Sequence, residues 1–391
     1  MAVIKWARAA THNAANTYLG ANGEVVVDME QNRLFLYDGA NAYVSNTFFS
    51  ANTYVFSATP YQFQGDTYGF IMGGFWSPSP SALSELTNEV RKFTFSSQTS
   101  AVDGADIGSF NVNGGSPGQN APSNSGKGHG YLERDGNFFE LNMNSSTPAT
   151  SLGFGLSPTA PFVSASSIFF NSDGDNLYAT GLDTPADTNV DGVEKFAFAS
   201  ASATSDFGEL LGSTDPGYGV QFHCTTNDSV GGFGYINGGR TSPSTFIDMI
   251  QRFPFSAGSY SGTDVAELLT PLYNSTGLSS PTHGYTYSGD TPSNPSTPQG
   301  IPNITKYPFA SNVPASNIGN RFNIGLDRAH GGAMMSTEAG YMTTGFPTLA
   351  PFTTFEYDND IVKINFVSDT NAADVGQFDK SRGTLAATSQ I

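Results

Sequence analysis

The chain has 391 residues, a formal net charge of −18 and only 13% charged residues. Its 16 Lys and Arg residues are scattered, whereas nucleic acid and anionic membrane surfaces need clustered basic residues, so both partner classes are excluded. No apolar run has bilayer length and no signal-peptide core follows Met1, which predicts no membrane insertion and a soluble product of a cytoplasm. The single cysteine, Cys224, excludes an intrachain disulfide and is expected to be buried in a strand.

The composition also indicates the fold class. The chain contains 31 Phe, 17 Tyr, 44 Gly and 22 Pro. Aromatic residues favour strands, and Gly and Pro favour the turns between strands. No long segment has apolar residues at helical spacing, and Ser81–Val90 is the best candidate for a short helical turn. An all-β fold is therefore predicted.

Residues 1–45 stand apart from the rest of the chain. Two short apolar strands around Val25 and Phe35 are joined by a turn at 30–32, which predicts a β-hairpin. A unit of this size cannot be stable alone, so it is expected to pack on a partner chain or on the next domain.

This N-terminal run resembles the short module at the start of many tailed-phage fibre, spike and tropism-determinant proteins. The matching positions are His12, Asn13, Gly20, Ala21, Gly23, Glu24, Asp28, Asp38 and Gly39. In that family the module joins an appendage to the virion or forms the base of a trimer. The resemblance implies that residues 1–45 are a virion-attachment or oligomerisation module. An ordinary hairpin leading into a β domain is the alternative.

A short motif recurs through residues 46–391. It consists of an aliphatic residue, any residue, Lys or Arg, an aromatic residue or Ile, any residue, and Phe. The copies end at Phe95, Phe198, Phe255, Phe309 and Phe366. Apart from its second residue the motif alternates between apolar and polar positions, which predicts a strand with one buried face.

The spacing of the motif predicts a repeat architecture. The last three intervals are 57, 54 and 57 residues, and the first is 103, about twice as long. A further copy is therefore expected inside the first interval, with Met143 in the place of Phe. A period of this length indicates units that cannot bury their apolar faces alone and must stack.

An apolar strand closed by a double Gly, then a variable loop and the basic–aromatic–x–Phe strand, resembles the kelch type of β-propeller repeat. The chain departs from that type because it lacks the usual late Trp. The resemblance implies a kelch-like propeller over residues 46–391 with six blades, and a seventh blade completed by N-terminal strands is the alternative. Segments 52–56 and 68–75 are expected to be the first two strands of the first blade. The expected blades are 48–112, 113–160, 161–214, 215–272, 273–322 and 323–391.

Several polar residues recur with the repeat. Three of the five His residues, His129, His283 and His330, recur at the same repeat position, which favours a repeated structural hydrogen bond over a ring of metal or acid–base imidazoles. Two stretches, 187–192 and 171–176, resemble parts of calcium loops, but Asp, Asn and Gly are also what turns require. Acidic residues that follow the Phe strand also track the repeat: Asp103, Asp106, Asp206, Glu209, Asp264, Glu267 and Asp374. We therefore expect no cofactor, no metal and no catalytic residue.

The resemblances together imply a structural protein of a tailed-phage virion. It would be an outward-facing capsid or tail appendage that adheres to a host surface glycan or protein. Its expected partners are other capsid or tail proteins, and itself as a trimer. Loops rich in Pro, Ser and Thr are where recognition is expected: Ser77–Leu86, Thr241–Phe246, Thr291–Pro302 and Phe346–Phe355. The alternative is a propeller that binds or degrades surface glycans, and the fold alone does not choose between these functions.

Overall fold

The computed structural model describes residues 5–9, 24–28, 33–37, 42–44, 64–73, 75–76, 85–86, 89–106, 124–125, 128–134, 137–155, 169–181, 191–199, 204–211, 220–242, 245–256, 261–291, 299–320, 328–329, 332–343, 346–347, 359–378, 382–383 and 386–389. Every regular element within these ranges is a β-strand, which confirms the predicted all-β class. The chain divides into two compact units, Met1–Thr59 and Pro60–Ile391. The predicted division after residue 45 stays a prediction.

The N-terminal unit contains one small sheet. Its strands are β1 (Lys5–Ala9), β2 (Glu24–Asp28), β3 (Arg33–Tyr37) and β4 (Ala42–Val44), in the order β1-β2-β3-β4. The antiparallel pair β2–β3 is the predicted hairpin, with Asp28 opposite Arg33. Two further strands flank it, since β1 runs parallel to β2 and β4 runs antiparallel to β3.

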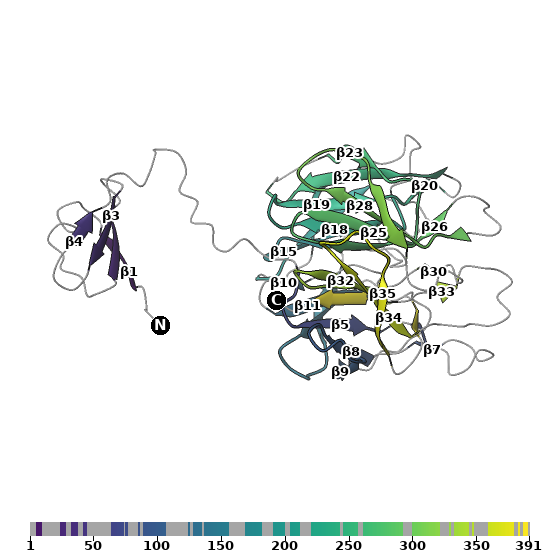
Figure 1. Ribbon diagram of the computed structural model, residues 1–391, viewed down its shortest axis with the longest axis horizontal. Helices are drawn as coiled ribbons and strands as arrows, with labels where there is room; N and C mark the ends of the chain where they lie inside the picture. Colours follow the sequence, from purple (N-terminus) through teal and green to yellow (C-terminus); the bar gives the residue numbers. More distant parts are fainter. Residues whose placement is uncertain are drawn as a thin grey trace. The chain divides into compact units, whose positions relative to one another are not determined.

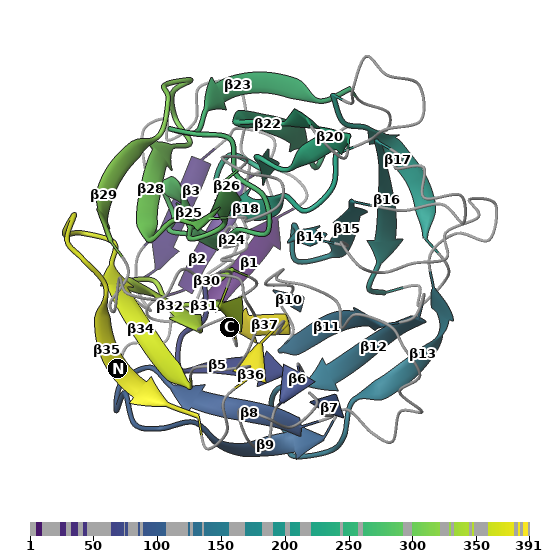
Figure 2. The same cartoon turned by 90° about the vertical axis from the view of Figure 1, so that its right-hand side faces the viewer.

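The second unit is a ring of four-stranded sheets arranged as a propeller (Figures 1 and 2). Each sheet is named here after its second strand. The β11 sheet consists of β10 (Asn124–Ser125), β11 (His129–Arg134), β12 (Asn137–Asn142) and β13 (Thr150–Gly155). The β15 sheet consists of β14 (Phe169–Ser172), β15 (Asn176–Thr180), β16 (Gly192–Ala197) and β17 (Ser205–Glu209). The β19 sheet consists of β18 (Cys224–Asp228), β19 (Phe233–Asn237), β22 (Met249–Pro254) and β23 (Thr263–Glu267).

The remaining sheets follow the same order around the ring. The β25 sheet consists of β24 (Thr276–Ser279), β25 (His283–Tyr287), β28 (Asn303–Pro308) and β29 (Ser316–Asn320). The β32 sheet consists of β31 (Ala333–Met335), β32 (Ala339–Thr343), β34 (Asp360–Asn365) and β35 (Ala373–Gln377). The β5 sheet consists of β37 (Ala386–Ser389), β5 (Tyr68–Met72), β8 (Glu89–Thr94) and β9 (Val102–Asp106).

The β5 sheet closes the ring, because its inner strand β37 comes from the other end of the unit (Figure 2). The sequence instead predicted that segment 52–56 would pair with the strand at 68–75. Segment 52–56 lies outside the described residues. The strand that pairs with β5, on the side away from β8, is β37. This pairing gives the β5 sheet the same four-strand order as the other sheets of the ring, with a hydrogen-bonded strand on each side of β5.

The recurring motif forms the third strand of its sheet. In β8, β16, β22, β28 and β34 the burial pattern begins intermediate, buried, buried, intermediate. A bulge in the pairing with the fourth strand falls between the two buried residues, for example between Ile250 and Gln251. The bulge turns both side chains inward, which explains why the second motif residue breaks the alternation.

The acidic or amide residues that track the repeat lie on the fourth strands, opposite this bulge. Asp374 pairs with Val362, and its Oδ1 accepts the N–H of Gly376 at 3.1 Å. Asn317 accepts the N–H of Gly319 in the same way, at 2.9 Å. These side chains therefore cap the local turn of the outer strand, as the structural interpretation predicted.

The last motif residue is fixed within its own sheet by a recurring backbone bond, called here the anchoring bond, and its carbonyl or ring contacts the previous sheet. The N–H groups of the six such residues all donate to a carbonyl in the turn before the second strand, at 2.9–3.0 Å: Phe95, Met143, Phe198, Phe255, Phe309 and Phe366. Four of the phenylalanines also have their carbonyl within 3.2–3.5 Å of a donating Tyr hydroxyl of the neighbouring sheet: Tyr341, Tyr178, Tyr235 and Tyr285.

Ring stacking accompanies these bonds. Each of the five phenylalanines lies against a Tyr of the neighbouring sheet, with ring centroids 4.5–5.0 Å apart. At the remaining junction Met143 and Phe70 share one hydrophobic cluster. The copy predicted from the spacing is therefore real, and in it Phe is replaced by Met and Tyr by Phe.

The inner strands are joined by a belt of hydrogen bonds between equivalent residues. The N–H of Asn227 donates to Ser279 Oγ at 2.8 Å, and the N–H of Ser279 lies 2.9 Å from Met335 Sδ. The N–H of Met335 donates to Ser389 Oγ at 2.7 Å. Asn171 donates to Asn227 Oδ1 at 2.7 Å. The first three contacts place a side chain of one sheet against a backbone N–H of its neighbour, and the Asn171–Asn227 bond joins two side chains.

Candidate functional site

One end of the ring carries a second tier of short strands (Figure 1). Seven of them arise between the second and third strands of a sheet, where the variable loops were predicted, and two lead into the first strand of a sheet. The short strands are β6 (Phe75–Trp76), β7 (Glu85–Leu86), β20 (Arg240–Ser242), β21 (Thr245–Phe246), β26 (Asp290–Thr291), β27 (Gln299–Gly300), β30 (Arg328–Ala329), β33 (Phe346–Pro347) and β36 (Arg382–Gly383). The helical turn predicted at Ser81–Val90 is wrong in its described part, since Glu85–Leu86 is β7 and β8 begins at Glu89.

The tier has a regular construction. In four sheets the segment that leads into the inner strand pairs with the start of the hairpin: β36 with β6, β30 with β33, Gln221 with Arg240 and Tyr273 with Asp290. Arg240 and Asp290 therefore hold equivalent positions in the β19 and β25 sheets. Figure 2 looks onto this end of the ring.

A cationic group is fixed on this end by the β19 sheet. The Arg240 guanidinium carbon lies 4.4 Å from the centre of the Phe222 ring. Its Nε and Nη2 donate to Gln221 Oε1 at 3.4 and 3.3 Å. Both Arg240 and Phe222 are half-buried. A cation over an aromatic face is held by the ring's quadrupole, so the guanidinium has a defined plane.

Two aromatic rings lie beside this cation. Phe246 of β21 and Tyr273 are both half-buried, with centroids 4.8 Å apart and planes at 38°. Burial raises the pKa of Tyr273, the carboxylate of Asp290 raises it further, and the charge of Arg240 lowers it. Both charges act on the Tyr273 hydroxyl and Phe246 contacts the Tyr273 ring, so the four side chains belong to one patch.

Buried hydrogen bonds hold the two sheets together beneath the patch. The N–H of Asn274 donates to the carbonyl of Phe222 at 2.7 Å, and Asn274 Nδ2 donates to Asp290 Oδ2 at 3.1 Å. Phe222 and Asn274 have equivalent, left-handed backbone conformations, with φ of 52° and 55°. Such a conformation is costly for residues other than Gly, and it persists only where the surrounding contacts enforce it. We call Gln221, Phe222, Arg240, Phe246, Tyr273, Asn274 and Asp290 the hairpin patch.

The predicted recognition loop Thr241–Phe246 contains Phe246, but the sequence did not single out the other residues of the hairpin patch. Its residues do not share a spacing or a residue type, because equivalent positions hold Arg240 in one sheet and Asp290 in the next. The sequence signal that could have found these positions is the glycine that directly precedes both Arg240 and Asp290. Gly239 has φ of 106°, and a Cβ there would meet the carbonyl oxygen of Gln221 at 2.6 Å, so the backbones meet where only Gly fits.

Cys224 and His223 lie in the interior below the patch. Cys224 is a buried strand residue, as predicted, and burial raises the pKa of its thiol. His223 is fully buried with its Nε2 2.9 Å from Thr180 Oγ1. Burial lowers the pKa of His223 to about 3, so the ring is neutral at ordinary pH. These groups are structural parts of the ring.

The recurring histidines make unlike contacts. His129 and His283 each begin the second strand of a sheet, so they are equivalent. His129 Nδ1 lies 3.1 Å from Glu140 Oε1, whereas His283 Nδ1 lies 2.8 Å from Thr282 Oγ1. In the β32 sheet the matching position is Ala339, and His330 lies outside the described residues. The shared hydrogen bond that the sequence suggested is thus not seen at the two described histidines.

The other candidates from the sequence fall as follows. Of the attachment-module residues, Glu24 begins β2 and Asp28 ends it; His12, Asn13, Gly23, Asp38 and Gly39 lie outside the described residues. In the stretch 171–176, Asp173 accepts bonds from Asn176 and Tyr178 of its own sheet. The described ranges contain no cluster of three or more His, Cys, Asp or Glu side chains that could hold a metal ion. No helix in them has the length and apolarity needed to cross a bilayer.

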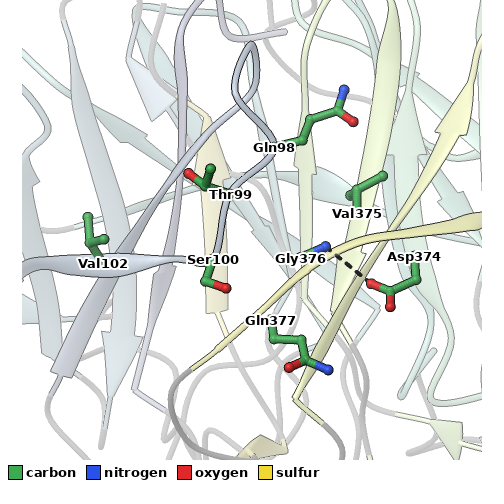
Figure 3. A pocket seen from close by; sticks show the side chains of 8 residues that line it. All are labelled: Gln98, Thr99, Ser100, Val102, Asp374, Val375, Gly376 and Gln377. Atoms are coloured by element: carbon green, nitrogen blue, oxygen red, sulfur yellow. Dashed lines mark hydrogen bonds between the residues drawn. The ribbon is translucent and has the colours of Figure 1, made fainter.

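An open hollow lies at the junction of the β5 and β32 sheets (Figure 3). It is lined by Gln98, Thr99, Ser100, Val102, Asp374, Val375, Gly376 and Gln377. The dashed bond in Figure 3 is the capping bond from Gly376 to Asp374. The N–H of Ala101 also donates to the carbonyl of Gln377, as Ala372 does to Asn320 at the previous junction. The hollow is therefore a product of the repeat and gathers no special chemistry.

The fold defines an all-β protein with a β-propeller ring, and the hairpin patch is its best candidate for recognition. No protein-family model matches the chain, and a search of curated proteins finds no match either.

Proposed function

We propose that this chain is a structural protein of a tailed-phage virion, an outward-facing capsid or tail appendage that adheres to the host surface. The proposal rests first on the resemblance of residues 1–45 to phage attachment modules. It is supported by the division of the chain, in which a small β unit, Met1–Thr59, is separate from the ring. In this proposal the small unit joins capsid or tail proteins or assembles as a trimer.

The observation that carries the adhesive part is the second tier of hairpins on one end of the ring. The repeat needs only four strands per sheet, and the tier adds strands that the stacking does not use. Non-repeating loops on a rigid scaffold are where proteins place recognition. The hairpin patch lies on this tier and holds half-buried aromatic rings beside a fixed guanidinium.

The propeller in this proposal is kelch-like with six blades. The support is that the described residues from β5 to β37 form six four-stranded sheets with one strand order, and that six residues make the same anchoring bond. A further support is the basic motif residue, which lies over an aromatic ring of its own sheet at 3.4–5.9 Å in five sheets.

A mass-spectrometric inventory of purified particles tests the proposal. We expect the chain at stoichiometric copy number, and its labelled position on the particle distinguishes capsid from tail. Purified full-length protein should also compete with particles for adsorption to host cells. Particles that lack the chain would refute the proposal.

The rival function is a glycan-degrading propeller, and the same purified protein decides it. Host surface polysaccharide that keeps its chain length after incubation favours adhesion alone, whereas shortened chains show an enzyme. Light scattering of the full-length protein measures whether it is a trimer.

A further inference from the structure

We propose that the hairpin patch is a binding site for a neutral glycan, with Tyr273 and Phe246 as its stacking platform. This inference rests on the proposed adhesive role, since it names the chemistry that the ring would recognise. It is carried by four side chains and the hydrogen bonds beneath them.

The platform consists of aromatic residues outside the recurring Phe–Tyr pairs that join one sheet to the next. In the pair of Phe309 and Tyr235 the residues are only 6% and 2% exposed. Phe246 and Tyr273 stay half-buried, and Phe246 lies on a hairpin outside the repeat. Pyranose rings present C–H groups on one face and hydroxyls at the edge. A half-exposed aromatic pair offers the matching apolar face, and Tyr273 adds a hydroxyl.

Polar groups at the edge of the platform fit sugar hydroxyls. Arg240 supplies guanidinium N–H donors in a plane set by Phe222 and Gln221. The carboxylate of Asp290 acts electrostatically on Tyr273 and accepts a hydrogen bond from Asn274 Nδ2 at 3.1 Å. Asn274 is 8% exposed, and its Oδ1 has no hydrogen-bond partner among the described residues. A few placed polar groups around an apolar surface are typical of small-ligand sites.

The site is rigid before any ligand binds. Phe222 and Asn274 are locked in left-handed conformations and joined by a 2.7 Å backbone bond. Preorganised groups lose little freedom on binding, which helps a weak contact such as ring stacking.

Charge selects a neutral ligand. The chain carries a net charge of −18, and Asp290 adds a carboxylate within the patch. A polyanionic glycan would be repelled over the surface as a whole, and Arg240 alone does not offset this. Binding of a neutral sugar should also change little between low and high salt, because no counterions are released.

The test measures binding of full-length protein to defined sugars by calorimetry. The probes are neutral oligosaccharides of glucose, galactose, mannose and N-acetylglucosamine, with polygalacturonate as the acidic member. We expect binding to at least one neutral probe, weakened roughly tenfold or more by Tyr273→Ala or Phe246→Ala. Tyr273→Phe should keep most of the affinity, since the ring remains.

A matched control exists in the same sheet. The guanidinium of Arg252 lies 4.6 Å from the centre of the Phe233 ring, which is the same kind of contact as Arg240 over Phe222. Phe233 is the first residue of β19, so this contact lies at the end of the strand away from β20. Arg240→Gln should weaken binding while Arg252→Gln should not. If Tyr273→Ala fails to fold, Phe246→Ala on the hairpin still decides the question.

Three results would overturn the inference: no neutral probe binds, only polygalacturonate binds, or the Phe246 and Tyr273 variants bind as wild type. The particle inventory is independent of these outcomes. Sugar binding by a chain that is absent from particles would support the site and refute the virion role. A chain that is present in particles but binds no neutral sugar would support the virion role and refute the site.

Discussion

Replacement of Phe309 by Ala tests the junction that recurs around the ring. Phe309 is 6% exposed, and its ring lies 4.9 Å from that of Tyr235 and 5.9 Å from that of Tyr307. The backbone carbonyl that accepts the Tyr235 hydroxyl remains in the variant, so the loss is that of the ring alone. Burial and the cavity together cost about 3–5 kcal/mol for Phe→Ala, of which aromatic pairing accounts for about 0.5–1.5 kcal/mol.

The repeat itself supplies the comparison. Met143 holds the equivalent position, so Phe309→Met should cost less than about 1.5 kcal/mol because the volume is nearly kept. Val367→Ala, at a residue 95% exposed, should change the free energy of unfolding by less than about 0.5 kcal/mol. Urea unfolding followed by circular dichroism measures all three. Equal losses for Phe309→Ala and Phe309→Met, or a loss below about 1 kcal/mol for Ala, would refute the reasoning.

Three further predictions follow from other parts of the ring. Gly277→Ala should strongly destabilise the fold, because its Cβ would lie 2.0 Å from the carbonyl oxygen of Thr225. Gly192→Ala, with open space around the new Cβ, should be nearly neutral. Thermal melts compare the two variants, and equal melting temperatures would contradict the close packing at Gly277. Deletion of 386–391 removes β37 and should make the ring sensitive to limited proteolysis, and an unchanged digestion pattern would argue against closure by that strand. The unfolded chain should take up one proton more than the folded chain between pH 6.5 and about 3, because burial holds the pKa of His223 low, so stability should fall as pH drops through this window. His223→Gln should flatten that fall in urea midpoints measured at pH 7 and pH 4, and an unchanged slope would assign it to other groups.

Sequence spacing was sufficient to predict the repeated parts of the fold. The interval between Phe95 and Phe198 predicted the copy at Met143, and the structure places Met143 in the same anchoring bond. This succeeds because an anchoring residue must recur wherever one sheet stacks on the next.

The parts that depend on pairing between distant segments could not be predicted in this way. Nothing local in 386–389 distinguishes it from a loop, since its role comes from β5, which lies more than three hundred residues earlier. The inward second residue of each motif was likewise missed, because a bulge moves it and the residue types there, such as Gln251 and Thr305, are polar.

Apart from Phe246, which lies in the predicted recognition loop Thr241–Phe246, the hairpin patch was missed for a related reason. Binding surfaces on a repeat scaffold are assembled from positions that differ between copies, so a search for recurrence passes over them. Phe246 and Tyr273 meet only because two loops from neighbouring sheets lie side by side.

The position of β37 sets a constraint on biosynthesis. The sheet that contains β5 stays one strand short until residues 386–389 have left the ribosome. A nascent or truncated chain therefore exposes an unpaired edge that invites pairing with another copy. Only chains that contain residues 386–389 can complete this sheet, so ring closure distinguishes them from chains cut before β37.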